Sequence, residues 1–99
     1  MNFMEKYGTL KVFLTTFLGN DADAYGESYP EIVDNAIDLV SGLKIDLQKD
    51  ASDFVNEFSD NDVATLYLNK LTNGEIGDVS FLRPSPLEFI FWLSGYLEQ

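Results

Sequence analysis

The sequence predicts an all-α fold, a compact single domain over residues 1–99 built as a bundle of about five helices. Apolar residues recur at intervals of three and four along most of the chain, which is the spacing of one helix face. Two segments combine a capping serine with a proline in the first turn, which is typical of helix starts. No internal repeat, low-complexity tract or Pro/Ser-rich linker divides the chain, so its apolar residues can fill one core.

The first helix is expected to run through the N-terminal segment as far as Leu18. Its core-facing positions are Phe3, Tyr7, Leu10, Phe13, Leu14, Phe17 and Leu18. Gly19 and Asn20 follow, and both residue types tolerate the left-handed conformation that often ends a helix. We therefore place the end of the helix at this pair.

The second helix is expected to begin after Ser28. The Ser28 hydroxyl can accept a hydrogen bond from an early backbone amide while Glu31 reaches back, and Pro30 fits the first turn. Its inward positions are Ile32, Val33, Ala36, Ile37 and Val40. Gly42 provides the break before the third helix.

The third and fourth helices are expected over about 43–58 and from Asp62 to the Asn73-Gly74 turn. The third offers Leu43, Leu47, Ala51, Phe54, Val55 and Phe58 to the core. The fourth follows the capping segment 59–62 and has Val63, Leu66, Tyr67 and Leu71 at helical spacing. Both helices therefore have one apolar face.

The last helix is predicted from Ser85, after an irregular loop over 75–84. Its start repeats the serine–proline cap, with Glu88 at the third helical position. Its apolar residues are Phe89, Ile90, Phe91, Trp92, Leu93, Tyr96 and Leu97. Because they occupy nearly every side, we expect this helix to lie at the centre of the bundle.

The chain is strongly acidic, with 17 acidic and six basic residues and a net charge of −11. Such a charge repels phosphate backbones and anionic lipids and attracts basic proteins, so neither direct nucleic-acid binding nor membrane binding is expected. The longest apolar run, 89–93, is far short of the ~20 residues that span a bilayer. Cysteine is absent and the segment Met4–Tyr7 lacks the pattern of an export signal, so we expect a cytoplasmic protein.

The composition also argues against catalysis and against a cofactor. Histidine and cysteine are both missing, which removes the usual nucleophile–base pairs and the common zinc ligands. Asp21, Asp23 and Gly26 resemble the start of a calcium loop, but Ile32 stands where that loop needs a bidentate glutamate. We therefore predict no enzyme activity, no cofactor and no metal site.

The signal with most weight is a set of acids at helical spacing. Asp46, Asp50, Asp53 and Glu57 follow intervals of four, three and four, which we interpret as a stripe opposite the apolar face of the third helix. Like charges at such intervals destabilise a helix by roughly 0.2–0.5 kcal/mol per pair, so a helix selected for stability alone would interleave lysines. A solvated face that maintains solubility is the alternative. The predicted partner-binding residues are Glu31, Asp34, Asp38, Asp46, Asp50, Asp53 and Glu57.

The chain resembles the small helical immunity proteins of bacterial contact-dependent growth inhibition systems. The resemblance lies in three segments: 10–18 (LKVFLTTFL) with Asp21 close behind, 29–34 (YPEIVD) and 86–93 (PLEFIFWL). It covers most of the chain in layout, whereas 43–83 matches only in being helical and polar.

The resemblance implies a cytoplasmic antidote that binds the C-terminal toxin domain delivered by a neighbouring cell, very often a nuclease, in a 1:1 complex. No binding residue carries over by motif, so the seven carboxylates remain the candidates. An acidic helical adaptor, or a nucleic-acid mimic that regulates a basic protein, is the alternative function. Reversing Asp46, Asp50, Asp53 and Glu57 to lysine is expected to abolish protection against the toxin and to leave the fold intact.

Overall fold

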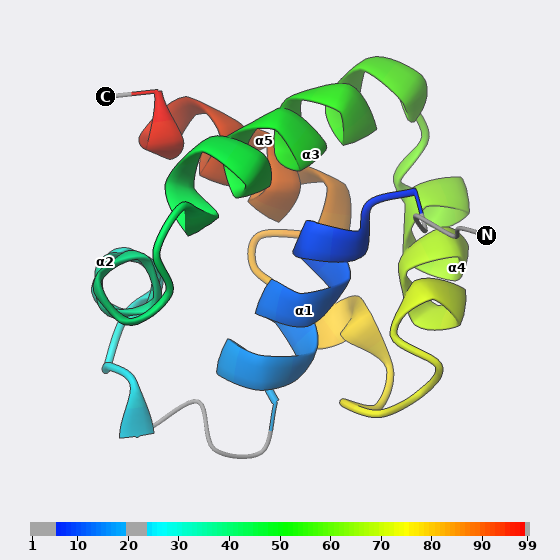
Figure 1. Ribbon diagram of the computed structural model, residues 1–99. Coiled ribbons are helices and arrows are strands. Elements are labelled where there is room, and N and C mark those ends of the chain that lie inside the picture. Colours follow the sequence, from blue (N-terminus) through cyan, green and yellow to red (C-terminus); the bar gives the residue numbers. More distant parts are fainter. Residues whose placement is uncertain (1–5, 20–23, 99) are drawn as a thin grey trace, which may run out of the picture.

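The structure is a computed structural model that describes residues 6–19 and 24–98. Within these ranges the chain forms five α-helices, one short 3-10 helix and no strand, which confirms the predicted all-α fold (Figure 1). The elements are α1 (Gly8–Phe17), α2 (Tyr29–Leu39), α3 (Leu43–Glu57), α4 (Asn61–Leu71), η2 (Val79–Phe81) and α5 (Pro86–Leu97). None of the described helices is long and apolar enough to cross a bilayer.

The helices α3 and α5 make the most extensive contact in the bundle. α3 packs along α5 and across α1 and also contacts α2, while α5 contacts α4 and η2 (Figure 1). The principal extents of 30, 29 and 27 Å are nearly equal, so the packing gives a compact globule. The expectation that α5 is covered on nearly every side is wrong for Phe91, which is 70% exposed.

Local sequence explains where three helices begin. Ser28 accepts a hydrogen bond from the Glu31 amide at the start of α2, and Ser85 accepts one from the Glu88 amide at the start of α5. Asp60 does the same for the Asp62 amide at the start of α4. The predicted caps are therefore confirmed, because each cap satisfies an amide that has no partner within its own helix.

The start of α1 depends on Tyr7, which has a left-handed backbone (φ 63°) and is 4% exposed. Its ring packs edge-on against Phe54 of α3 and Tyr67 of α4, with ring centroids 5.3 and 5.8 Å away. The ring of Phe58 contacts those of Phe54 and Tyr67, with ring centroids 4.5 and 4.9 Å apart. We call Tyr7, Phe54, Phe58 and Tyr67 the aromatic cluster; it joins α1, α3 and α4. Phe3, predicted to share the face of α1, lies outside the described residues.

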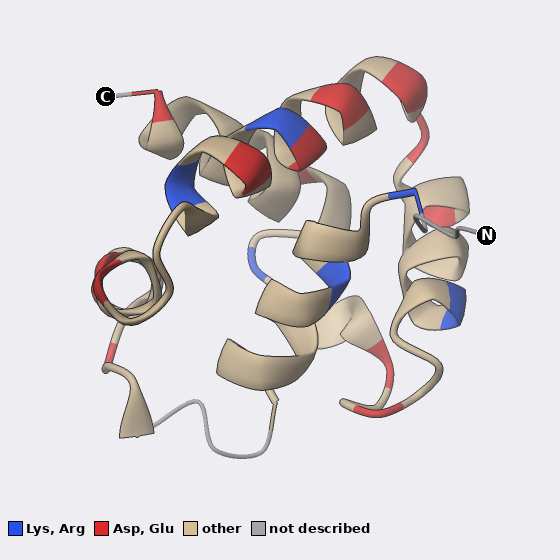
Figure 2. Ribbon diagram, viewed as in Figure 1, with Lys and Arg blue, Asp and Glu red and all other residues tan. Residues whose placement is uncertain are grey.

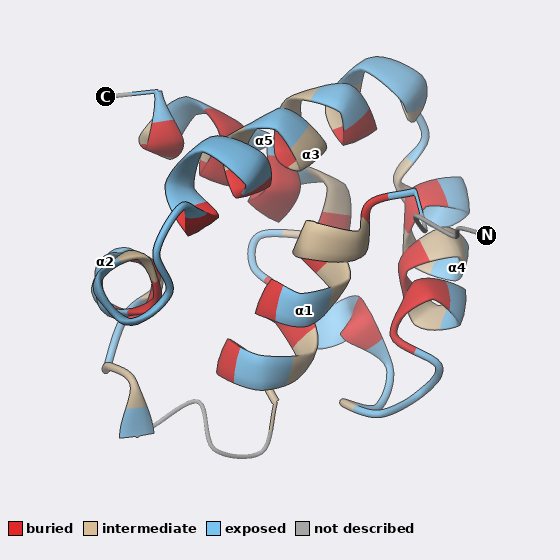
Figure 3. Cartoon of the chain, in the orientation of Figure 1, coloured by how far each residue is buried: buried red, intermediate tan, exposed pale blue. Residues whose placement is uncertain are grey.

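The face of α4 differs from the prediction. Leu71 is buried as predicted and Tyr67 is half-buried, but Val63 and Leu66 are 50% and 64% exposed, while Ala64 and Leu68 are buried (Figure 3). Two asparagines of α4 also accept hydrogen bonds from backbone amides later in the chain. The side-chain oxygen of Asn61 accepts from the Leu87 amide at 3.0 Å, and that of Asn69 accepts from the Val79 amide at 2.8 Å.

The inward face of α2 is confirmed for Ile32, Val33 and Ala36, and Ile37 is half-buried. Val40, also predicted to face the core, is exposed because α2 ends at Leu39 and the chain then turns toward α3. This turn contains Gly42, whose φ of 80° lies in the left-handed region that favours glycine. Val40 is therefore available at the surface beside the start of α3.

Candidate protein-binding surface

The four acids of α3 lie at the border of its buried face. Successive helical residues are about 100° apart, so Asp46, Asp50, Asp53 and Glu57 centre roughly 85° from the buried face of α3. The prediction that they stand opposite the apolar residues is therefore wrong. They border α1 instead, and Figure 2 shows acidic segments along the length of α3. We call these four residues the acidic edge.

Asp50 fastens α3 to α1. It is half-buried, and its Oδ2 atom accepts a hydrogen bond of 3.0 Å from the backbone amide of Leu10, in the first turn of α1. Amides in the first turn have no partner inside the helix, and a carboxylate there also interacts favourably with the helix dipole. Asp50 therefore has a structural role that its sequence position does not reveal.

Replacing Asp50 with alanine is expected to lower the free energy of unfolding by about 0.5–2 kcal/mol, because the Leu10 amide loses its acceptor. Asp50→Asn keeps a side-chain oxygen and should recover much of the loss. Urea denaturation followed by circular dichroism measures both. Asp46→Ala is the matched control, since it removes an exposed acid from the same helix. An equal loss in the Asp50→Ala and Asp46→Ala variants would contradict the role assigned to Asp50.

Glu57 makes a second structural contact, at the other end of the acidic edge. It accepts a hydrogen bond from the Tyr7 hydroxyl and pairs with Lys6, whose Nζ lies 3.0 Å from its Oε1. The Tyr7 hydrogen bond and then the Lys6 contact lower the pKa of Glu57. The pKa of Tyr7 is raised, first by burial and then by Glu57. The carboxylate thus helps to hold the left-handed residue before α1.

The stability from this contact is expected to depend on pH. Because the folded-state pKa of Glu57 is lowered, its contribution is present above the ordinary value of 4.5 and is lost as the pH falls through the lowered value. Tyr7→Phe removes the largest cause, so the pKa of Glu57 should rise toward 4.5 and the acid-induced loss should shrink. Carboxyl carbon shifts of Glu57, followed by NMR against pH in both proteins, test this. An unchanged pKa in Tyr7→Phe would contradict it.

The other two members of the acidic edge are more available to a partner. Asp46 and Asp53 are both exposed. Asp53 lies 3.4 Å from the Nζ of Lys49 one turn earlier, and an exposed pair of this kind is weak. A basic partner could therefore displace Lys49 from Asp53 at small cost.

The three predicted acids of α2 lie elsewhere. Glu31, Asp34 and Asp38 are exposed on the side of α2 opposite its buried residues. Glu31 reaches back as expected and accepts from the Glu27 amide at 2.7 Å, and Asp34 accepts from the Tyr96 hydroxyl at 2.9 Å. The Asp34 hydrogen bond raises the pKa of Tyr96.

The two acidic sets do not form one surface. Asp34 lines a small hollow with residues that lie on the α5 side of α3, namely Ile37, Lys44, Tyr96 and Leu97. The acidic edge lies on the α1 side of α3. Since α3 stands between them, a partner bound over the acidic edge would not lie directly on Asp34.

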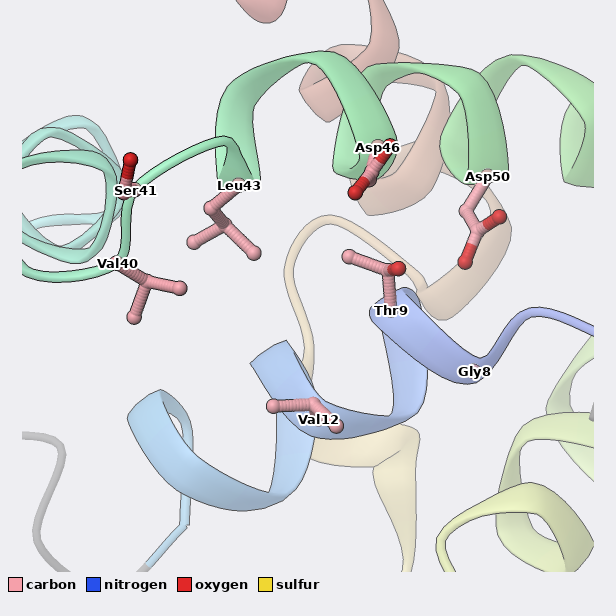
Figure 4. A pocket seen from close by; sticks show the side chains of 8 residues that line it. All are labelled: Gly8, Thr9, Val12, Val40, Ser41, Leu43, Asp46 and Asp50. Carbon is pink, nitrogen blue, oxygen red and sulfur yellow. The ribbon is translucent and has the colours of Figure 1, made fainter. Parts of the chain in front are cut away.

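A groove of about 430 Å³ lies beside the N-terminal half of the acidic edge (Figure 4). Its lining combines three apolar side chains, two hydroxyls and two carboxylates. The lining residues are Gly8, Thr9 and Val12 of α1, Val40 and Ser41 of the turn after α2, and Leu43, Asp46 and Asp50 of α3. The structure thus brings two of the predicted acids together with Val12 and Val40, which the sequence did not single out as surface residues.

This lining is suited to binding. Its carboxylates and hydroxyls accept hydrogen bonds, and the exposed apolar side chains offer contact area. Over 6–19 and 24–98, no group of three or more acidic side chains is placed to hold a metal ion. Asp21 and Asp23 of the calcium-loop pattern fall outside these ranges.

Comparison with family models, with curated proteins and with solved structures finds no match to this chain. The functional assignment therefore depends on the residues of the chain itself.

Proposed function

We propose that this protein is an immunity protein of a contact-dependent growth inhibition system, which binds a basic toxin domain in the cytoplasm and neutralises it by stoichiometric occlusion. The observation that carries the proposal is the surface beside α1. Exposed Asp46 and Asp53 border a groove that presents exposed Val12 and Val40, in a chain with a net charge of −11. The negative charge of this surface attracts a cationic protein, and its exposed apolar area gives that partner contact surface.

A nuclease toxin supplies the matching chemistry. Nucleases gather lysine and arginine to hold phosphates, and an acidic helix edge can occupy such a basic cleft in place of the nucleic acid. Opposite charges also steer the two proteins together, which speeds association and makes it sensitive to salt. Inhibition of this kind requires no chemistry from the immunity protein.

The contacts of each carboxylate divide the seven candidates by role. Asp46 and Asp53 are proposed to meet the partner directly. Glu57 holds α1 in place, Glu31 and Asp34 satisfy groups within the fold, and Asp50 both holds α1 and lines the groove. These four still add to the negative field that attracts the partner. Asp38 is exposed on α2 and belongs to the same field.

The test is to mix the protein with the toxin domain encoded beside its gene. We expect a tight 1:1 complex in size-exclusion chromatography with light scattering, association that slows as salt is raised, and toxin activity that falls in proportion to the protein added. Absence of a complex would reject the proposal. A large secreted protein encoded immediately upstream would favour it.

A second candidate is an acidic adaptor that mimics nucleic acid against a basic enzyme or repressor. It is favoured by the linear form of the acidic edge, which places four carboxylates along roughly 16 Å of α3. Binding to such a regulator, with no effect on the neighbouring toxin, would favour this candidate over immunity.

A further inference from the structure

We propose that the groove between α1 and α3 binds one arginine side chain of the protein partner. This inference rests on the proposed function and deepens it, because it names the chemical group that is recognised and the residues that recognise it. The groove places the exposed side chains of Val12 and Val40 beside the carboxylates of Asp46 and Asp50.

The apolar part of the groove fits the stem of a long cationic side chain. Val12 and Val40 are 52% and 39% exposed, and Leu43 lines the same hollow from the α3 side (Figure 4). The methylene groups of arginine lie along apolar surface while the charged end reaches a polar site. Covering Val12 and Val40 in this way removes exposed apolar area from water, which a small inorganic cation would not do.

The polar part of the groove fits the charged end. Asp46, Asp50 and Thr9 point into the same space between α3 and α1 in Figure 4. Asp50 uses its Oδ2 atom for the Leu10 amide, which leaves its Oδ1 atom as an acceptor. The N-termini of α1 and α3 each add roughly half a positive charge, so the two carboxylates leave the groove with a net charge of about −1. The groove therefore favours a cation despite the two helix N-termini beside it.

Arginine fits these acceptors better than lysine does. Its planar guanidinium has five N–H donors in a fixed fork and is less strongly hydrated than an ammonium group. The groove offers carboxylate oxygens from Asp46 and Asp50 and the hydroxyl oxygen of Thr9 beside them. One guanidinium can donate to several of these acceptors at once, whereas a lysine ammonium interacts as a point charge. Arginine is also among the residues that dominate binding energy at interfaces.

The experiment titrates the protein alone with N-acetyl-arginine methylamide at about 0.15 M salt, followed by ¹⁵N NMR. We expect saturable shifts of the amide signals of Thr9, Val12, Ser41, Leu43 and Asp46. The citrulline compound, which has the same shape without the charge, should produce no such shifts. The lysine compound should bind more weakly than the arginine compound.

The matched variants are Asp46→Asn and Glu75→Gln, which change the net charge equally. Glu75 is exposed in the turn after α4 and does not line the groove. Asp46→Asn is expected to weaken binding about two- to fivefold, the effect of removing one exposed ion pair, while Glu75→Gln leaves it unchanged. Unperturbed amide signals outside the groove show that each variant is folded.

Three results would overturn the inference: no saturable shift at the groove, equal binding by the two variants, or lysine binding as strongly as arginine. Each result leaves the immunity function open, because the probe experiment contains no toxin. Conversely, the protein could bind the arginine compound in the groove and form no complex with the toxin domain. This pair of results would support the arginine site and reject the proposed function.

Discussion

Replacing Phe54 with alanine is expected to lower the free energy of unfolding by about 3–5 kcal/mol, which is a large part of the stability of an ordinary domain. Phe54 is fully buried at the centre of the aromatic cluster. Its ring centroid lies 5.3 Å from that of Tyr7, 4.5 Å from that of Phe58 and 6.0 Å from that of Tyr67. Because these rings come from α1, α3 and α4, neighbouring side chains cannot easily close the cavity that the substitution leaves.

Guanidinium denaturation followed by far-UV circular dichroism measures this loss. Phe91→Ala is the matched control, since it is the same substitution at a residue of α5 that is 70% exposed. The control is expected to change stability by roughly 0.5 kcal/mol. Similar losses in the two variants would show that the aromatic cluster does not stabilise the fold as described.

Reversing Asp46 and Asp53 to lysine is expected to weaken the complex with the cognate toxin by at least about tenfold, because like charges then face each other across the interface. Each reversal adds two charges, so the net charge changes from −11 to −7. Most of the effect should appear as slower association with a weaker dependence on salt. Biosensor kinetics at several salt concentrations provide the measurement.

The control for this pair is Glu75→Lys with Glu98→Lys, which changes the net charge equally at two exposed residues away from the acidic edge. Thermal melting shows whether both double variants remain folded. If the control pair weakened binding as much as the first pair, only the overall charge would matter and the acidic edge would not be the contact surface.

The structure gives a reason to leave Asp50 and Glu57 out of this design. From the sequence, reversing all four acids of the edge was expected to leave the fold intact. A lysine at position 50 would instead lose the acceptor for the Leu10 amide and place a cation at the N-terminus of α1. A lysine at position 57 would lose the acceptor for Tyr7. We therefore expect the fourfold reversal to destabilise the protein.

Features decided within a few residues could be predicted from the sequence. The helix starts at Ser28 and Ser85 depend on a hydroxyl and an amide three residues later, and both appear as expected. Gly42 also lies immediately before α3, as predicted. Its left-handed backbone is a property of the residue itself and can be expected from a glycine at this place. Helix number and order followed from such signals and from apolar spacing.

Features decided by distant residues could not be predicted. Apolar residues surround much of α4, so spacing alone could not choose between Leu66 and Leu68 for the core. The choice depends on how α4 packs against α5 and η2, which lie later in the chain. The same holds for Asp50, whose partner Leu10 is 40 residues distant and belongs to another helix.

The candidate site was predicted in part. Carboxylates at helical spacing identified the acidic edge, but helical spacing does not show which neighbouring helix the edge borders. Val12 and Val40 have apolar neighbours in the sequence and no polar signal of their own. Only the packing of α1 beside the turn after α2 places them on one groove with Asp46.

The groove is lined in part by exposed residues, whereas the residues that support it are buried. Val12, Val40, Ser41 and Asp46 are exposed, whereas Leu43 and Leu10 behind them are buried. Substitutions at such exposed positions usually alter stability by no more than about 0.5 kcal/mol. A lineage could therefore exchange one partner for another through a few outward-facing substitutions, with little risk of losing the folded state on the way.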